Sequence, residues 1–325
     1  MLLIVSILLS LCIISNADEI ANSRVVGGKE VEKGRYPFSV SLTRSGRHKC
    51  GGSLISPEYI LTAAHCADAV RDAEIGRHDR GYYDDYSYEK IGIANKFIHP
   101  DYNEFTLEND VMVVQLYRRV SSNYTAITLD DNPDFLKPED IVTTMGWGRI
   151  SYGGEVSEVQ LETEVDVISN EECASAPSSY YRDNIIEGSL CAYREGTDSC
   201  QGDSGGPLIV KGENSTSDVL VGTVSWGVGC AYEGYPGVYA RVSSYVTWIK
   251  AVALIDVPTA SPTAAETYSK IPSSTPSISS FPSFSHAPSS SNFPSLAPTF
   301  NVTPKPTELR CSLQTIFKQI TTLFQ

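Results

Sequence analysis

Between residues 25 and 245 the apolar residues occur in short runs that are rich in β-branched residues, and clusters of Gly, Pro, Asn and Asp separate the runs. Short strands divided by turn residues are typical of an all-β barrel or sandwich. These runs are Phe38 to Leu42, Ile60 to Ala63, Val111 to Leu116, Ile141 to Met145 and Leu220 to Trp226. A late segment differs, because its apolar residues recur at helical spacing and predict a short amphipathic helix that closes the domain. They are Tyr245, Trp248, Ile249 and Val252.

Composition divides the 325-residue chain unevenly. Residues 25–255 mix apolar, charged and Gly residues as a globular domain does, and this length can bury a large core. From Pro258 to Thr307, 30 of 50 residues are Ser, Thr or Pro. Such a segment has too few large apolar groups to offset the entropy of ordering, so we expect residues 256–308 to be a disordered linker.

The last residues, 309–325, carry another helical apolar pattern. It is compatible with a small amphipathic helix that docks on a partner or lies on a membrane surface, and also with chance. Association of the protein with a membrane or wall through this tail therefore stays open.

The chain begins with one apolar run, which is too short to span a bilayer comfortably and is followed by the small residues Ser15 and Ala17. The pattern predicts a secretory signal peptide over residues 1–17, and hence an extracellular protein. A buried N-terminal strand or an anchor is the alternative.

The chain has eight Cys, of which Cys12 would leave with the signal and Cys311 lies in the tail. An even set of six in an exported domain implies disulfides, although spacing alone permits 15 connectivities. The six are Cys50, Cys66, Cys173, Cys191, Cys200 and Cys230. Sequons for N-linked glycans begin at Asn123, Asn214 and Asn301.

The formal net charge is −14. An acidic surface argues against nucleic acid and against anionic membranes as main partners. The sequence has no CxxC-type metal cluster, and nothing in it calls for a cofactor.

A Gly-rich turn surrounds Ser204, in the segment Gly202-Asp203-Ser204-Gly205-Gly206-Pro207. Small residues let the backbone approach a ligand closely, and the amides of Gly202 and Ser204 could bind a developing oxyanion. A serine hydroxyl needs a neighbouring general base, and His65 follows an apolar strand in TAAHC. Taken alone, the Ser204 motif would indicate only a turn.

Asp110 opens the apolar run that continues to Leu116. A carboxylate at such a strand edge is expected to be partly buried and to need a hydrogen-bond donor, which His65 could supply. The alternative is an Asp exposed to water at the start of a strand. The remaining histidines are interpreted as ordinary polar, loop or tail residues: His48, His78, His99 and His286.

The motifs occur in the order His, Asp, Ser, which is the chymotrypsin order rather than the subtilisin or α/β-hydrolase order. The matching segments are VVGG at 25–28, TAAHC at 62–66, DVMVVQL at 110–116, DSCQGDSGGP at 198–207, SWG at 225–227 and PGVYARV at 236–242. On these motifs the chain resembles the chymotrypsin–trypsin family from Val25 to about Val252. The resemblance implies two six-stranded antiparallel β-barrels with a short C-terminal helix. The active site would lie between the barrels, with His65, Asp110 and Ser204 as the catalytic triad.

The resemblance also implies pairings and specificity. It pairs Cys50 with Cys66, Cys173 with Cys191 and Cys200 with Cys230. Asp198 would lie at the floor of the primary pocket and select substrates with Arg or Lys. Ser199 could bind the same cationic group, and Gly227 and Gly237 would form the pocket walls. Ser225, Trp226 and Gly227 would pair with the substrate backbone as an added strand.

Activation follows from the same resemblance. Residues 18–24 would be a propeptide, and cleavage after Arg24 would free the α-amino group of Val25. That ammonium would insert beside Asp203 and shape the oxyanion hole, because a buried charge needs a partner. The resemblance further implies peptide or protein substrates with Arg or Lys at the cleaved bond, and protein inhibitors as further partners.

Many relatives of this kind hold calcium in the loop after the His, where Arg77 stands at the place of the first acidic ligand. A cation repels a hard metal ion, so we expect no calcium here despite Asp84, Asp85 and Glu89.

Two other functions are alternatives to an active protease. A catalytically inactive relative would only bind partners, although such proteins usually lack a triad residue. In the other alternative, the Ser/Thr/Pro-rich segment would attach the domain to a wall or matrix, and proteolysis would be secondary.

Overall fold

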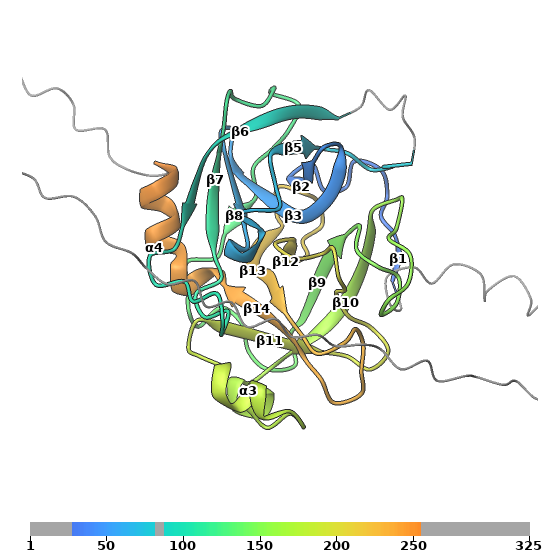
Figure 1. The fold of residues 1–325 in the computed structure, drawn as a ribbon, viewed down its shortest axis with the longest axis vertical. Helices are drawn as coiled ribbons and strands as arrows, with labels where there is room; N and C mark the ends of the chain where they lie inside the picture. The colour runs from blue at the N-terminus through green and yellow to red at the C-terminus, as the bar shows by residue number, and fades with distance from the viewer. Residues whose placement is uncertain (1–27, 82–87, 255–325) are drawn as a thin grey trace, which may run out of the picture. The chain divides into compact units, whose positions relative to one another are not determined.

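A computed structural model describes residues 28–81 and 88–254 (Figure 1). The predictions for the signal peptide, the propeptide and the C-terminal tail lie outside these residues. So do those for Arg24, Val25, Asp84, Asp85, Asn301 and Cys311.

The first barrel is closed by six antiparallel strands in the order β2-β3-β4-β7-β6-β5. Its strands are β2 (Ser39–Arg44), β3 (Arg47–Ser56), β4 (Tyr59–Thr62), β5 (Asp72–Ile75), β6 (Glu89–Ile98) and β7 (Met112–Leu116). Strands β4 and β7 are buried along almost their whole length, which explains why their sequences are continuous apolar runs.

The second barrel also has six antiparallel strands, in the order β10-β11-β14-β13-β12-β9, and the pairing of β9 with β10 closes it. Its strands are β9 (Ile141–Gly146), β10 (Leu161–Ile168), β11 (Ser189–Tyr193), β12 (Pro207–Val210), β13 (Val219–Trp226) and β14 (Gly237–Arg241). The predicted pair of six-stranded barrels is therefore confirmed. Two short strands that the sequence did not predict add to this sheet: β1 (Lys29–Glu30) pairs with β10, and β8 (Thr128–Leu129) runs parallel to β13.

Helices are few and short. A 3-10 turn covers Ala64–Cys66, α2 covers Asn170–Ala174, α3 covers Ser179–Asn184 and α4 covers Val242–Ala253. The predicted closing helix is confirmed as α4, which packs against β7, β8 and β13. Its buried residues are Val242, Tyr245, Val246, Ile249 and Ala253. Among the described helices, none has the length and apolar character needed to cross a membrane.

Three disulfides join the predicted partners, and all three expected pairings are confirmed. They are Cys50–Cys66, Cys173–Cys191 and Cys200–Cys230. Each bridge restricts the unfolded chain and so stabilises the fold. Two of them include a residue within four positions of His65 or Ser204, so they also fix the candidate site.

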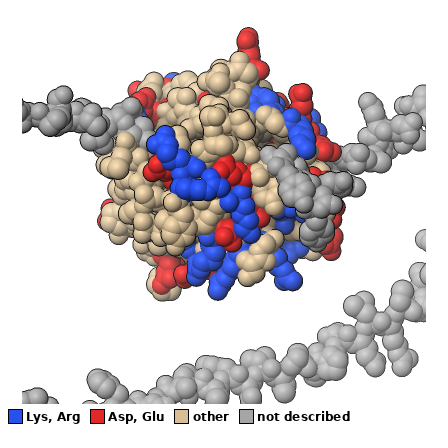
Figure 2. Space-filling model, turned by 90° about the horizontal axis from the view of Figure 1, so that it is seen from above, with Lys and Arg blue, Asp and Glu red and all other residues tan. Residues whose placement is uncertain are grey.

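Charge is divided unevenly between the barrels. Residues 130–254 contain 20 acidic and seven basic residues, whereas the described residues from 28 to 129 contain 12 acidic and 13 basic ones. Figure 2 views the face at the top of Figure 1, where β5 and β6 lie, and Lys and Arg side chains gather across it with acidic side chains between them. The negative net charge therefore belongs to the second barrel.

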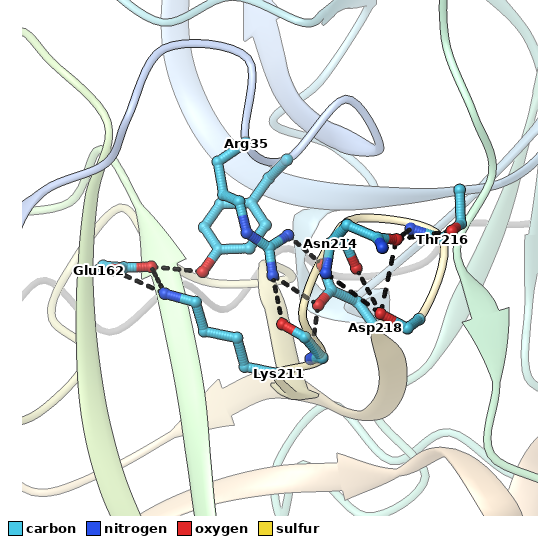
Figure 3. Close-up of polar contacts among 9 residues, drawn as sticks. Arg35, Glu162, Lys211, Asn214, Thr216 and Asp218 are labelled. Atoms are coloured by element: carbon cyan, nitrogen blue, oxygen red, sulfur yellow. Dashed lines mark hydrogen bonds and ion pairs between the residues drawn. The ribbon is translucent and has the colours of Figure 1, made fainter.

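A polar cluster ties the N-terminal segment to the second barrel (Figure 3). Arg35 forms a two-point ion pair with Asp218, with N–O distances of 2.5 and 2.8 Å. Next to it, the Tyr36 hydroxyl donates to Glu162, which also accepts from Lys211 at 2.9 Å. Asp218 is fully buried and the Arg35 side chain is 16% exposed, so each charge depends on the other for compensation.

We predict that Arg35→Met destabilises the protein by about 3 kcal/mol, because it leaves the Asp218 carboxylate buried without a cation. Urea unfolding measures the loss. The control is Lys137→Gln, which removes a highly exposed ion pair with Asp134 and should cost less than about 0.5 kcal/mol. A second substitution, Asp218→Leu, should recover much of the loss. Equal unfolding free energies for Arg35→Met and Lys137→Gln contradict this role.

Candidate active site

The carboxylate of Asp110 lies at the centre of the candidate site. It is 1% exposed and accepts hydrogen bonds from the His65 backbone amide (2.9 Å), the His65 ring nitrogen Nδ1 (2.7 Å) and the Ser225 hydroxyl (2.6 Å). The bond to Nδ1 fixes the tautomer of the ring and leaves Nε2 as the nitrogen that can accept a proton. The His65 ring is partly exposed, so a substrate can reach it.

Local structure places these two residues. His65 lies in the 3-10 turn that follows β4, and the bridge from Cys66 to Cys50 of β3 holds this turn against the barrel. Asp110 directly follows Asn109, whose φ of 55° is in the left-handed region where Asn is tolerated. The Tyr245 hydroxyl donates to the side chain of Asn109 at 3.2 Å, so α4 stabilises this turn.

Ser225 reaches Asp110 through an irregularity in β13. The register with β14 shifts between Val224 and Trp226, which pair with Tyr239 and Val238. Ser225 is therefore the extra residue of a β-bulge, and bulges next to active sites redirect a side chain. The sequence analysis gave Ser225 a place only at the substrate-binding edge, and its hydrogen bond to the buried carboxylate was missed.

The turn that carries Ser204 is held against both barrels. The Ser204 carbonyl accepts from the Gly51 amide (2.8 Å) of the first barrel, and the Gly205 amide donates to Val224 (2.8 Å) of the second. Gly205 has a φ of 76°, and a Cβ there would lie 2.0 Å from the Thr62 hydroxyl. The glycine is thus required by both conformation and space.

The structure brings Ser204 and His65 to the same region from different barrels. Among the described residues, no hydrogen bond joins the Ser204 hydroxyl to the His65 ring. Such bonds often form with good geometry only when substrate is bound. The arrangement supplies a hydroxyl, an imidazole and a buried carboxylate, which together can perform nucleophilic acyl transfer.

His48 lies behind the proposed oxyanion donors. Its Nε2 donates to the Gly202 carbonyl (2.8 Å), and its Nδ1 accepts from the Ser41 hydroxyl (2.9 Å). Burial lowers the pKa of His48 to about 3, so the ring is neutral. The amides of Gly202 and Ser204 donate no hydrogen bond to any described residue, which leaves both available for a ligand. The sequence interpretation of His48 as an ordinary polar residue did not include this contact, because no sequence pattern indicates a partner 154 positions away.

A pocket of about 150 Å³ opens beside Ser204. Its lining contains every predicted substrate-binding residue: Asp198, Ser199, Ser225, Trp226, Gly227 and Gly237. Asp198 is buried and accepts from the Ala231 amide at 3.0 Å. Burial raises the pKa of Asp198 to about 7, and the amides of Ala231 and Ser199 oppose that rise.

The walls of this pocket depend on small and aromatic residues. A Cβ on Gly237 would lie 3.0 Å from the Asp198 carboxylate, so only glycine leaves the carboxylate accessible. A Cβ on Gly227 would make ordinary contacts at 3.7 Å, and only a longer side chain there would enter the pocket. The Trp226 ring packs on Tyr181 with centroids 4.8 Å apart. Tyr181 was missed because it lies in α3, outside every motif.

Asp203 is a second buried carboxylate near the pocket. It accepts from the amides of Gly148 (2.8 Å) and Cys200 (2.9 Å). Burial raises the pKa of Asp203 to about 6, and these two amides oppose that rise. Within residues 28–81 and 88–254, no cationic side chain forms an ion pair with it.

Two places bear on metal binding. The sulfur atoms of Cys50 and Cys66 lie close to the His65 ring, but they are joined in a disulfide and offer no thiolate ligand. In the loop after β5, the buried Arg77 guanidinium forms an ion pair with Glu74 at 2.7 Å. Among the described residues of that loop, Arg77 therefore supplies a buried cation.

A family model described as Trypsin matches residues 25–249. The chain belongs to the trypsin family. Over 233 residues it is 38% identical to "Trypsin delta" of Drosophila melanogaster, and the match covers 70% of this chain and 88% of that protein. Over 240 residues it is 36% identical to "Trypsin I-P1" of Gallus gallus, covering 73% and 91%.

A longer relative matches over a smaller share of its length. The chain is 37% identical over 243 residues to "Serine proteinase stubble" of Drosophila melanogaster, a match that covers 70% of this chain and 31% of that protein. The shared region is thus the trypsin-family domain. Together with the two barrels and the disulfides, these similarities make the chain a trypsin-family serine protease.

Proposed function

We propose that this trypsin-family protein is a secreted serine endopeptidase that cleaves after Arg or Lys through His65, Asp110 and Ser204. The observation that carries the proposal is a single pocket whose lining contains both Ser204 and the buried carboxylate of Asp198. A cationic substrate side chain that pairs with Asp198 brings its own carbonyl group close to Ser204.

The chemistry follows from the hydrogen bonds. His65 Nε2 takes the proton of Ser204 as the hydroxyl oxygen attacks the carbonyl carbon. The amides of Gly202 and Ser204 stabilise the oxyanion, and Asp110 stabilises the imidazolium that forms. His65 then gives its proton to the leaving amine, and water repeats the sequence on the acyl-enzyme.

We predict that Ser204→Ala and His65→Ala each lower kcat/KM for an Arg amide by a factor on the order of 10⁴ to 10⁶, and that the double variant is no worse than either, because the residues act as a unit. The exposed Ser122→Ala serves as control and should keep full activity. Retention of a hundredth of the activity by either single variant counts against the mechanism.

Selectivity for a cation should depend on the ionisation of Asp198. Its pKa of about 7 means that the carboxyl group is mostly charged at pH 8 and mostly neutral at pH 6. A charged carboxylate attracts guanidinium strongly, whereas a neutral carboxyl group does not. The preference for a basic substrate should therefore weaken as the pH falls.

We predict that the ratio of kcat/KM for an Arg substrate to that for its uncharged citrulline analogue falls about tenfold from pH 8 to pH 6, in proportion to the ionised fraction of Asp198. Any pH dependence that the two substrates share cancels in this ratio. Asp198→Asn should give a low ratio that does not change with pH. A wild-type ratio that is constant over this range rules out the assignment of Asp198.

Activation is proposed to follow cleavage after Arg24. The support is Asp203, a buried carboxylate that lacks a cationic partner among the described residues and so would gain from an inserted ammonium group. Arg24 itself suits the pocket at Asp198, so the active enzyme should process its own precursor.

We predict that purified precursor converts with a lag and then accelerates, and that mass spectrometry finds Val25 at the new N-terminus. Arg24→Gln should block conversion and Arg24→Lys should preserve it. A Ser204→Ala precursor should convert only after active enzyme is added. Unaided conversion of that precursor refutes self-activation, as does wild-type precursor that waits for a foreign protease.

Secretion and glycosylation complete the proposal. The three disulfides and the apolar run over the first residues of the sequence favour an oxidising compartment. Of the sequon residues in the described part, Asn123 and Asn214 are both exposed, so each could carry a glycan.

A further inference from the structure

A cluster of cations lies on and beside the hairpin formed by β2 and β3. Its members are Arg44, Arg47, Lys49 and Arg71, and all four are exposed. None of them forms an ion pair with a carboxylate in the described part of the chain. Lys90, Arg118 and Arg119 on the same barrel differ, because each pairs with an acidic side chain.

The conformation of the hairpin places its positive charges close together. Ser45 and Gly46 have φ values of 54° and 72°, as in the two-residue turns that match the twist of paired strands. Arg44 and Arg47 are direct partners in the β2–β3 register, and like charges in such pairs are destabilising. The next shift in register leaves Lys49 as the extra residue of a bulge. An anion placed between these side chains would relieve the repulsion.

The acidic residues around the cluster do not neutralise it. Asp72 lies 3.8 Å from Lys90, and the buried Glu74 pairs with Arg77. Asp68 is exposed, and its contact with Arg44 is through the backbone carbonyl, which accepts at 3.0 Å. The hairpin thus carries an excess of positive charge on a protein whose net charge is −14.

The position of the hairpin indicates which part of a substrate can reach it. His48, between Arg47 and Lys49, donates to the Gly202 carbonyl, and Gly51 donates to the Ser204 carbonyl. The hairpin therefore adjoins Ser204 from the first barrel, whereas the pocket at Asp198 is formed by the second. A substrate whose cleaved residue fills the pocket can therefore extend its leaving group past Ser204 toward the first barrel.

We propose that Arg47 and Lys49, assisted by Arg44, bind acidic side chains on the C-terminal side of the cleaved bond. This inference rests on the proposed function, because it requires Ser204 to be the nucleophile. The acidic second barrel and the basic hairpin then orient a substrate that is basic before the cleaved bond and acidic after it. A peptide suits this position better than a large polyanion. Arg47 and Lys49 flank His48, which contacts Gly202 two residues before Ser204, so the side chains they meet belong to the first residues after the cleaved bond.

Quenched fluorescent peptides test the proposal. They share one sequence up to the cleaved Arg and carry Asp-Glu, Asn-Gln or Lys-Lys at the second and third positions after it. At low salt we expect wild-type kcat/KM to be about fivefold higher for the acidic peptide than for the neutral one and lowest for the basic one, and 0.5 M NaCl should remove most of the difference. The ratio within one enzyme does not depend on how much of it is folded.

Arg47→Gln/Lys49→Gln should bring the acidic-to-neutral ratio close to one. The matched control, Arg118→Gln/Arg119→Gln, removes the same charge from paired cations and should keep the wild-type ratio. Equal rates for the three peptides, or an unchanged ratio in the hairpin variant, overturn the proposal.

A small Arg amide, which has no peptide after the bond, distinguishes failure of the hairpin proposal from failure of the proposed function. If the wild-type enzyme fails to cleave it, the proposed function is wrong, and the hairpin proposal falls with it.

Discussion

The buried carboxylate of Asp110 is the interaction on which the site depends. Its three hydrogen-bond donors come from the turn after β4 and from a bulge in β13, so one anion joins segments of both barrels. Burying a carboxylate is costly unless donors surround it, and here the donors are also the groups that must be positioned. The cost of burial is thus offset by the same contacts that fix the orientation of His65.

The second barrel repeats this use of buried acids. Asp198 and Asp203 are both buried, both have pKa values raised by burial, and both are held by backbone amides. Each therefore gains stability when a cation arrives from outside the described chain. In the proposed function one cation is the substrate side chain and the other is the new N-terminus. The proposed function thus assigns positive ligands to the second barrel, and the hairpin proposal assigns negative ones to the first.

Much of this arrangement could be predicted from the sequence, because it depends on patterns and motifs of residues that lie close together in the chain. The apolar runs predicted strands, the helical spacing from Tyr245 predicted α4, and the resemblance to the chymotrypsin–trypsin family implied the two barrels and the pocket lining. Contacts between distant segments could not be predicted. The pairs Arg35–Asp218 and His48–Gly202 join residues more than 150 positions apart, and no periodicity or motif indicates them. The bulge at Ser225 is set by strand pairing, which one strand's sequence does not reveal.

The central claim is that His65 and Asp110 activate Ser204 and no other hydroxyl. The most direct measurement is labelling of the activated enzyme with a fluorophosphonate, followed by mass spectrometry of its peptides. The account predicts one modified residue, Ser204, and a rate of labelling that falls at least a thousandfold, on the order of the loss expected for a triad residue, in His65→Ala. Modification of another serine, or undiminished labelling without His65, would contradict it.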